Sequence, residues 1–432
     1  MNGWPLSNEV TTVALYRTYG QRYIGIMKNS ENKVNLERGL KILALFIHRY
    51  RWGEQIRGDE RGFLEKMRLY RDLGVEVYVI ELRPSLQQTV SEKVYTSLLI
   101  NLNLKWGDNA LNQLTNLLLL TINAVHLSRK VRFNVIYVHN QDLENVVPAL
   151  FIKFLSKRPM VIVFHLFYND YALCFRKAFS RMLSKGFRFM GALLRSILGS
   201  LRRCAFRNAD LIICVSDSVK DDVTEHISAE RVAVVHNGVN TNFFKKYEFP
   251  KTYDAAFLGR LCPQKGLDVL LNAWRLVTLE FKEAKLVLIG GGDKKHIARY
   301  RDLIHELQLE DTVELKGFVP DKELVILLNS SKLFVFPSRY DGFALAVSEA
   351  MACGLPCVVS DIPALRENYG GAAVLMKPND VGCLADAIKE LLKDETKREL
   401  LSRRSRELAC KLDWRKTVDK EIGLITNLLQ RT

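Results

Sequence analysis

The chain has 432 residues, of which 48% are hydrophobic and 26% charged, and its mean hydropathy is near zero. This composition is typical of a globular protein and argues against a disordered chain or an integral membrane protein. The length exceeds what one hydrophobic core usually supports, so we expect two domains of ordinary size.

The positive charge is concentrated in the first part of the chain. The formal net charge is +15. The first 250 residues hold 35 basic and 22 acidic residues, a net charge of +13, and the remainder hold 28 and 26, a net charge of +2. This imbalance predicts that the first half meets an anionic partner or surface.

The start of the chain and its cysteines give no sign of secretion. The first residues, MNGWPLSNEV, lack a basic segment followed by an apolar one, so we expect a cytoplasmic protein. The eight cysteines have mostly apolar neighbours and no paired CxxC spacing, which predicts buried, reduced thiols and no metal site. Residues 1–40 have weak periodicity and are expected to be an N-terminal extension of unknown role.

A first domain is expected over residues 41–248. Short runs rich in Val, Ile and Leu alternate there with amphipathic stretches, which is typical of a parallel sheet with helices on both faces. The apolar stretch Leu114–Val125 is too short to span a bilayer, and we expect a buried helix there. A helix is also expected over 62–74, and the expected strands are 41–47, 75–82, 135–139, 159–165, 211–216 and 232–238.

A second domain of the same α/β class is expected over residues 249–415, after a polar connector. Residues 416–432 are expected to form a helix that crosses back to the first domain. Two doubly wound domains would face each other across a cleft, with ligands at the carboxyl ends of the strands. The expected strands are 255–260, 285–292, 312–319, 333–338, 356–361 and 372–376.

Cations and glycines follow the first strands of the second domain. Arg260 and Lys265 come directly after a strand, and together they suit a diphosphate, although a solvated loop would also carry such residues. Gly290 begins a run of three glycines that would let the backbone approach a ligand. Phe318 follows the next strand and would border a nucleobase, unless it is an ordinary core side chain.

Two acids lie eight positions apart in SRYDGFALAVSEA. Asp341 lies in a turn opened by Gly342, where it would accept hydrogen bonds from sugar hydroxyls, or merely cap the turn. Glu349 lies about two turns into the following helix, where it would reach a ribose or face solvent. The start of that helix is expected to offer phosphate the free backbone amides of Phe343, Ala344 and Leu345.

These motifs resemble, in order and spacing, a family of enzymes. GR-x4-KG, GGG, KGFVP and DGF-x5-E-AMACGLPCVVSDIPALRE resemble the C-terminal domain of family 4-like retaining glycosyltransferases, group 1, which have the GT-B fold of two Rossmann-like domains facing across a cleft. The resemblance covers roughly Lys41 to the C-terminus. It implies that Arg260 and Lys265 bind the donor diphosphate, Asp341 the donor sugar and Glu349 the ribose. The family usually has Glu at the first acid, and Asp341 is one methylene shorter.

The first half resembles the family more loosely. RWGEQIRGDERGFLEKM resembles the family's glycine-rich loop and helix, with Gly58 and Gly62 as loop glycines close to donor phosphate and acceptor. His165, which closes a strand, resembles the histidine near the donor sugar in relatives, although by itself it reads as a packed residue.

The resemblance implies a metal-independent and cofactor-free transfer. A hexosyl unit would pass, with retention, from a UDP- or GDP-sugar to a sugar or lipid-linked acceptor, and His165, Arg260, Lys265 and Asp341 would be the catalytic residues. There are two alternatives: a catalytically weak GT-B-like scaffold that binds polyanions or a partner enzyme, which stays open, and an NAD-dependent enzyme. The second would need a full GxGxxG motif, which is missing.

A basic insertion is expected at about 174–208. Cys174–Arg207 interleaves nine Lys and Arg with Phe, Leu, Ile and Met and contains no acid. This composition predicts contact with an anionic membrane surface, or else a helix packed on its own domain with a solvated basic face. No RNA- or DNA-binding module accompanies the charge, so we expect no nucleic acid partner.

Overall fold

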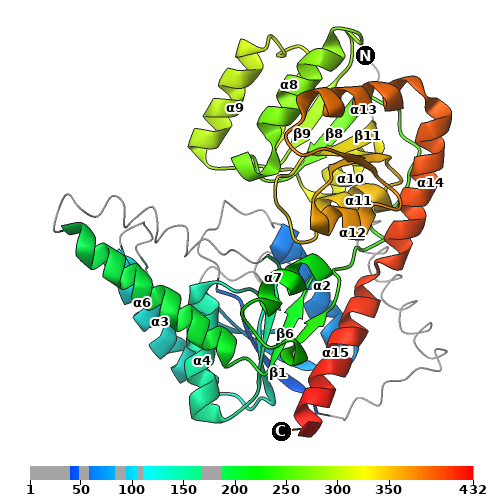
Figure 1. The fold of residues 1–432 in the computed structure, drawn as a ribbon. Coiled ribbons are helices and arrows are strands. Elements are labelled where there is room, and N and C mark those ends of the chain that lie inside the picture. Colours follow the sequence, from blue (N-terminus) through cyan, green and yellow to red (C-terminus); the bar gives the residue numbers. More distant parts are fainter. Residues whose placement is uncertain are drawn as a thin grey trace, which may run out of the picture. The chain divides into compact units, whose positions relative to one another are not determined.

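The computed structural model contains two parallel β-sheets, each covered by helices (Figure 1). It describes residues 39–47, 58–82, 94–102, 104, 110–166 and 187–431, and only the backbone of 58, 59, 110 and 187–195. Leu40–Thr432 forms one compact unit. Apart from Gly39 and Leu40, the extension expected over residues 1–40 lies outside the described residues, as do residues 174–186 of the basic insertion.

The first sheet has seven parallel strands in the order β3-β2-β1-β4-β5-β6-β7. Its strands are β1 Lys41–Leu45, β2 Glu76–Leu82, β3 Thr96–Ile100, β4 Val135–Val138, β5 Met160–Phe164, β6 Leu211–Cys214 and β7 Val232–Val234. Its helices are α2 Gly58–Asp72, α3 Ala110–Ser128, α4 Leu143–Ser156, α6 Phe187–Arg207, α7 Asp217–Thr224 and the short η4 Ala229–Arg231.

The second sheet has six parallel strands in the order β10-β9-β8-β11-β12-β13. Its strands are β8 Tyr253–Leu258, β9 Leu286–Ile289, β10 Val313–Gly317, β11 Ser331–Phe336, β12 Cys357–Ser360 and β13 Val374–Met376. Its helices are η5 Pro263–Lys265, α8 Leu267–Thr278, α9 Lys294–Glu306, α10 Asp321–Asn329, α11 Leu345–Ala352, α12 Pro363–Tyr369, α13 Val381–Lys393 and α14 Glu395–Lys411.

The strand order places a topological switch point in each sheet. The chain first adds strands on one side of β1 or β8 and then crosses to the other side with β4 or β11. The loops that leave the two central strands therefore diverge, and in open parallel sheets ligands bind at such a point, outside the carboxyl ends of the strands. In the second sheet these loops begin at Gly259 and Pro337.

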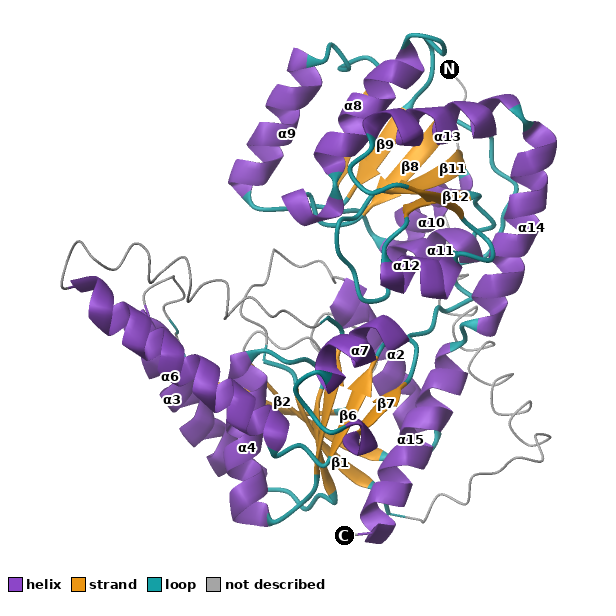
Figure 2. Ribbon diagram, in the orientation of Figure 1, coloured by secondary structure: helices purple, strands orange, loops and turns teal. Residues whose placement is uncertain are grey.

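The last helix, α15 Trp414–Arg431, returns to the first sheet (Figure 2). Glu421 of α15 is completely buried and accepts hydrogen bonds from Lys66 at 2.5 Å and Tyr70 at 2.6 Å, both on α2. The hydroxyl of Tyr137, on β4, lies 3.3 Å from the same carboxylate. The chain's final helix thus completes the core of its first half.

The strands expected from the sequence exist, with bounds that differ by a few residues, but one strand was missed. β3 is an edge strand whose side chains are mostly only half-buried, so it lacks the continuous apolar run that marks the central strands. The expectation of buried cysteines was wrong for Cys204 and Cys410, which are exposed. No disulfide joins the cysteines in the described part of the chain.

The expectation of a buried helix around Leu114–Val125 was half wrong. The helix exists as α3, and its inner face, which includes Leu117 and Leu120, is buried. On its outer face Leu118 and Ile122 are 59% and 57% exposed. Apolar composition alone does not tell how many faces of a helix are covered.

Candidate active site

Three of the predicted donor-binding residues, Arg260, Lys265 and Asp341, follow the two strands at the switch point of the second sheet. Arg260 follows β8, and Asp341 follows β11. In the sheet β8 lies between β9 and β11 and pairs with both. Arg260 is exposed, and no ion pair joins it to another described residue. The guanidinium is therefore accessible to a ligand at the edge where the doubly wound fold leaves a crevice.

Lys265 and Asp341 form an ion pair across this edge. The Nζ of Lys265 contacts Oδ2 of Asp341, and the two side chains are 13% and 14% exposed. Gly266 allows the approach of the two loops, because its φ is +68° and a Cβ there would lie 2.0 Å from the carbonyl oxygen of Pro337. The sequence placed both residues near a donor but did not predict that they pair.

Asp341 also organises the turn before α11. Its Oδ1 accepts hydrogen bonds from the amides of Gly342 at 3.1 Å and Ala344 at 3.2 Å. The expectation that the amide of Ala344 is free was therefore wrong, because the acid that opens the turn also caps it. The amides of Phe343 and Leu345 have no acceptor among the described residues.

A buried tyrosine is hydrogen-bonded to the backbone carbonyl groups of the same turn. The hydroxyl of Tyr369, on α12, lies 2.5 Å from the carbonyl oxygen of Phe343 and 3.1 Å from that of Ala344. Burial raises the pKa of Tyr369 well above its usual value, so the hydroxyl keeps its proton for these bonds. Ala344 adopts a left-handed φ of +58° in this turn.

His165 lies directly against the turn. A Cβ on Gly342 would lie 1.8 Å from the carbonyl oxygen of His165, so only glycine fits there. The Nε2 of His165 lies 2.9 Å from the carbonyl oxygen of His139, at the end of the neighbouring strand β4. The structure thus brings the backbone of His165, in the first half, beside the Asp341 turn of the second half. The imidazole ring of His165 is hydrogen-bonded to the backbone of His139.

Glu349 is buried and bound by an arginine from the first half. Its side chain is 7% exposed, and its Oε1 lies 2.6 Å from Nη1 of Arg61, on α2. The same guanidinium reaches Asp321, at the start of α10, with 2.5 Å between Nη2 and Oδ1. The alternative in which Glu349 faces solvent is therefore excluded.

The charged groups of this cluster shift one another's pKa values. Burial raises the pKa of Glu349 above its usual value, while Arg61 acts in the opposite direction. Burial lowers the pKa of Arg61, but Glu349 and Asp321 outweigh that effect and hold it above its usual value. Sequence reasoning missed Arg61 because nothing in RGDERGF indicates a partner 288 residues away.

The glycine run after β9 is explained largely by packing. Gly290 has a φ of +120°, and a Cβ there would lie 2.1 Å from the carbonyl oxygen of Gly259 at the end of β8. A Cβ on Gly291 would lie 2.2 Å from the ring of Phe318. Phe318 is half-buried over this bare backbone, at the edge of the sheet where the sequence predicted a nucleobase.

The two glycines of the first half are not in a loop. Helix α2 begins at Gly58 and includes Gly62, so the prediction of loop glycines was wrong. A Cβ on Gly62 would lie 3.4 Å from the ring of Trp414 and 3.5 Å from the side chain of Leu345. Gly62 therefore lies where α2 meets the starts of α15 and α11, at a position that would hold a Cβ in ordinary van der Waals contact.

A third tie between the halves is made by Glu367, on α12. Its carboxylate accepts hydrogen bonds from the amides of Asp217 at 2.8 Å and Ser218 at 3.0 Å, at the start of α7. The Nε2 of His236 lies 3.1 Å from the same carboxylate. Asp217, His236 and Glu367 have ligand-type atoms within 4.8 Å of one another, as a metal site would. The two hydrogen bonds that Glu367 accepts from backbone amides instead identify it as a cap for the start of α7.

Two family models match successive parts of the chain. The model for Glycosyltransferase Family 4 matches residues 56–243, and the model for Glycosyl transferases group 1 matches residues 239–408. The chain is 27% identical over 229 residues to O-antigen chain mannosyltransferase B of Escherichia coli, a match that covers 50% of this chain and 60% of that relative.

Another relative comes from an archaeon. The chain is 31% identical over 221 residues to an uncharacterized glycosyltransferase of Methanocaldococcus jannaschii, a match that covers 50% of this chain and 58% of the relative. Both matches therefore span less than two thirds of the curated relatives' own length. The fold is also that of Anabaena HepE, whose crystal structure holds UDP and glucose. The TM-score is 0.70 at 18% identity, over 90% of this chain and 99% of that one.

Proposed function

We propose that this chain, a member of the glycosyltransferases with the two-domain GT-B fold, transfers a hexosyl unit from a nucleotide-diphospho-sugar to an acceptor hydroxyl. The observation that carries the proposal is the meeting of Arg260, Lys265 and Asp341 at the switch point of the second sheet. Two cations and one carboxylate at that edge match a donor with a diphosphate next to a sugar.

Each residue then has a role in binding the donor. Arg260 and Lys265 hold the diphosphate, and Lys265 exchanges its bond to Asp341 for a phosphate oxygen. Asp341 is thereby released to accept hydrogen bonds from hydroxyls of the donor sugar. Glu349 binds the ribose, and Phe318 borders the base beside Gly291.

The chemistry is a retaining substitution at the anomeric carbon. The bond from that carbon to the diphosphate oxygen breaks, and a bond to the acceptor oxygen forms on the same face. The acceptor's proton passes to an oxygen of the leaving phosphate. Negative charge develops on this phosphate, so Arg260 and Lys265 stabilise the transition state. His165 adjoins the turn of Asp341 and is proposed to face the donor sugar through its own backbone. The proposal involves no metal and no cofactor.

The donor and acceptor are proposed by class. A UDP- or GDP-sugar is the donor, in line with the UDP of the HepE complex and the mannosyltransferase among the relatives. A saccharide or a lipid-linked saccharide is the acceptor, and the reaction takes place at the cytoplasmic face of a membrane that Cys174–Arg207 helps to contact. No helix in the described part of the chain has the length and apolarity needed to cross a bilayer.

The deciding experiment is donor binding measured by thermal shift. The purified chain is scanned against UDP-, GDP- and ADP-sugars, with and without EDTA, as wild type and as Arg260→Ala and Glu349→Ala. We expect one nucleotide to raise the melting temperature, with EDTA having no effect and both substitutions abolishing the shift. Arg301→Ala, an exposed arginine on α9, is the matched control and keeps the shift. A folded protein that no donor stabilises would favour the polyanion-binding scaffold instead.

A further inference from the structure

Large apolar side chains are exposed on three neighbouring helices of the first half. On α3 the exposed positions repeat at i, i+7 and i+11, so they form one stripe along the helix. Helices α3, α4 and α6 pack against one another. The exposed apolar residues on them are Leu111, Leu118, Leu119, Ile122, Phe151, Phe154, Leu155 and Ile197, which we call the α3–α4–α6 face.

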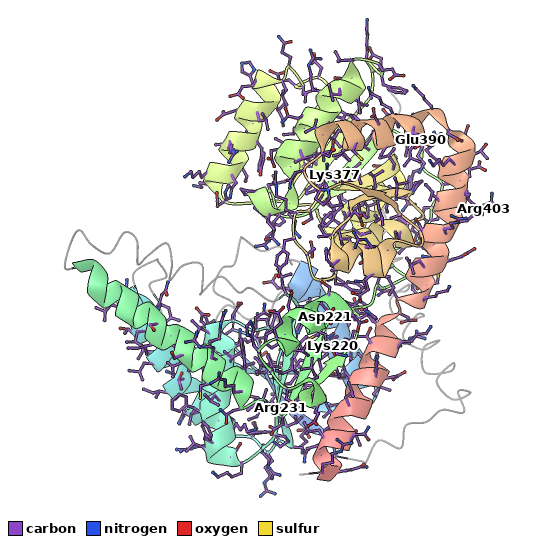
Figure 3. All side chains as sticks on the ribbon, in the orientation of Figure 1. Lys220, Asp221, Arg231, Lys377, Glu390 and Arg403 are labelled. Atoms are coloured by element: carbon purple, nitrogen blue, oxygen red, sulfur yellow. The ribbon has the colours of Figure 1, made fainter. Side chains whose placement is uncertain are left out.

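Cations gather at one end of this face. All three helices return from the carboxyl to the amino ends of the parallel strands, so their C-termini lie at the same edge of the sheet. Arg231, labelled in Figure 3, marks this edge, because its guanidinium donates to the carbonyl oxygens of Arg207, the last residue of α6, and of Ala209 just beyond it. The exposed cations there are Arg129, Lys130, Arg132, Lys157, Arg158, Arg203 and Arg207.

Acids are scarce around the same helices. Between Ala110 and Ala209 the acidic residues are Asp142, Glu144 and Asp170, and α3 and α6 contain none. Among the described residues, no ion pair neutralises Arg129 and Lys130 beyond α3 or Arg203 and Arg207 at the end of α6. Cations at helix C-termini suit the helix dipole, but that effect does not account for leucines left in water beside them.

We propose that the α3–α4–α6 face docks on an anionic lipid bilayer. Its leucines and phenylalanines enter the boundary between headgroups and acyl chains, while the cations at the helix ends contact anionic headgroups. A second copy of the chain fits this face less well, because the same face on that copy has few acids and so offers these cations no anionic partner. The surface differs from the one expected at Cys174–Arg207, since it is built largely on α3 and α4.

This docking brings the first half to the bilayer, where the glycan end of a lipid-linked acceptor would be. That last step rests on the proposed function, but the docking itself does not. A protein that binds vesicles and no donor would contradict only the proposed function. A protein that binds a donor and no vesicle would contradict only the docking.

The test is co-sedimentation of the full chain with phosphatidylcholine vesicles, with and without phosphatidylglycerol. We expect binding that needs phosphatidylglycerol and weakens at high salt. Lys157→Glu with Arg158→Glu should reduce partition by at least about tenfold, because each cation near an anionic surface contributes roughly fivefold. Leu118→Gln with Ile122→Gln should also reduce it about tenfold or more, through lost apolar burial.

Matched controls come from the second half. Leu279→Gln changes a leucine that is 61% exposed, and Arg403→Glu with Arg404→Glu changes two exposed cations of α14; both proteins should bind vesicles like the wild type. All variants alter exposed positions, and an unchanged melting temperature and circular dichroism spectrum show that they are folded. The proposal would be overturned if the wild-type protein does not co-sediment with anionic vesicles, or if the protein with Leu118→Gln and Ile122→Gln binds them as well as the wild type. So would a dimer in light scattering that this pair of substitutions converts to a monomer without any vesicle binding.

Discussion

At the scale of single residues, the pairing of Arg61 with Glu349 has a measurable pH signature. In Arg61→Met the buried Glu349 loses its cation, so its folded-state pKa rises further above the unfolded value. Stability is then lost as pH rises through that interval, because the folded state must give up a proton that it holds more tightly. We expect a loss of roughly 3 kcal/mol near pH 8 and a smaller loss near pH 5, measured by urea unfolding.

Two further variants locate this effect. Glu349→Gln in the Arg61→Met background should remove the pH dependence, because no carboxylate remains to titrate. Cys353 and Tyr369 also interact with Glu349, and Asp321 faces it from α10. None of these three residues is mutated in any of the variants. Arg71→Met, at an exposed ion pair on the same helix, should change stability by less than about 1 kcal/mol. A pH-independent loss in Arg61→Met would contradict the assignment.

Gly342 gives a second residue-scale prediction. Gly342→Ala places a methyl group 1.8 Å from the carbonyl oxygen of His165, so either the Asp341 turn or the end of β5 must move. We expect a lower melting temperature and a weakened donor-induced shift. Gly371→Ala is the matched control, because nothing lies within 4 Å of its added Cβ, and it should leave both measurements unchanged. Equal behaviour of the two variants would show that the turn yields easily.

Residue by residue, the sequence predicted the position of the site better than its contacts. Arg260, Lys265 and Asp341 follow strands that pair in the sheet, and strand ends can be placed from an apolar pattern. The bonds of Glu349 and Asp341 could not be predicted, because their partners depend on how distant loops and helices pack. The role of Gly62 was misassigned for the same reason, since its neighbour Trp414 lies 352 positions later.

At the scale of elements, the contact of α15 with α2 is a buried polar cluster inside an apolar core. The side chains of Lys66 and Glu421 are 1% and 0% exposed. Removing one charge leaves the other buried without its counter-ion, so Lys66→Met should cost about 3–5 kcal/mol in the free energy of unfolding. Lys66→Met with Glu421→Leu should recover part of that loss, which a double-mutant cycle measures. Additive losses would mean that the pair is not coupled.

Elements also mark the limit of sequence patterns. The strands of both sheets follow from runs of Val, Ile and Leu because a strand buried on both faces has no polar side. Helix α3 has an equally apolar sequence, yet one of its faces is exposed. Its composition would be the same whether protein, lipid or water lay on that face, so only the packing of its neighbours distinguishes these cases.

At the scale of the whole molecule, three ties between the halves predict cooperative unfolding. Arg61 bonds Glu349, Gly342 abuts His165, and Glu367 caps the start of α7. With α15 packed in the first half as well, we expect a single calorimetric transition for Leu40–Thr432. Glu367→Ala removes one tie and should broaden this transition. Two separate transitions in the wild-type chain would contradict the prediction.

The position of α15 also constrains the order in which the protein is made. The first sheet leaves the ribosome early, but until α15 has been synthesised Lys66 has no counter-ion and Tyr70 and Tyr137 lack the carboxylate that accepts their hydrogen bonds. During translation the nascent first half therefore lacks both the counter-ion of Lys66 and the helix that covers α2, a state that favours local opening and chaperone binding. A stop codon near position 414 would consequently destabilise the first domain, at the beginning of the chain, more than the second domain, which ends next to the stop.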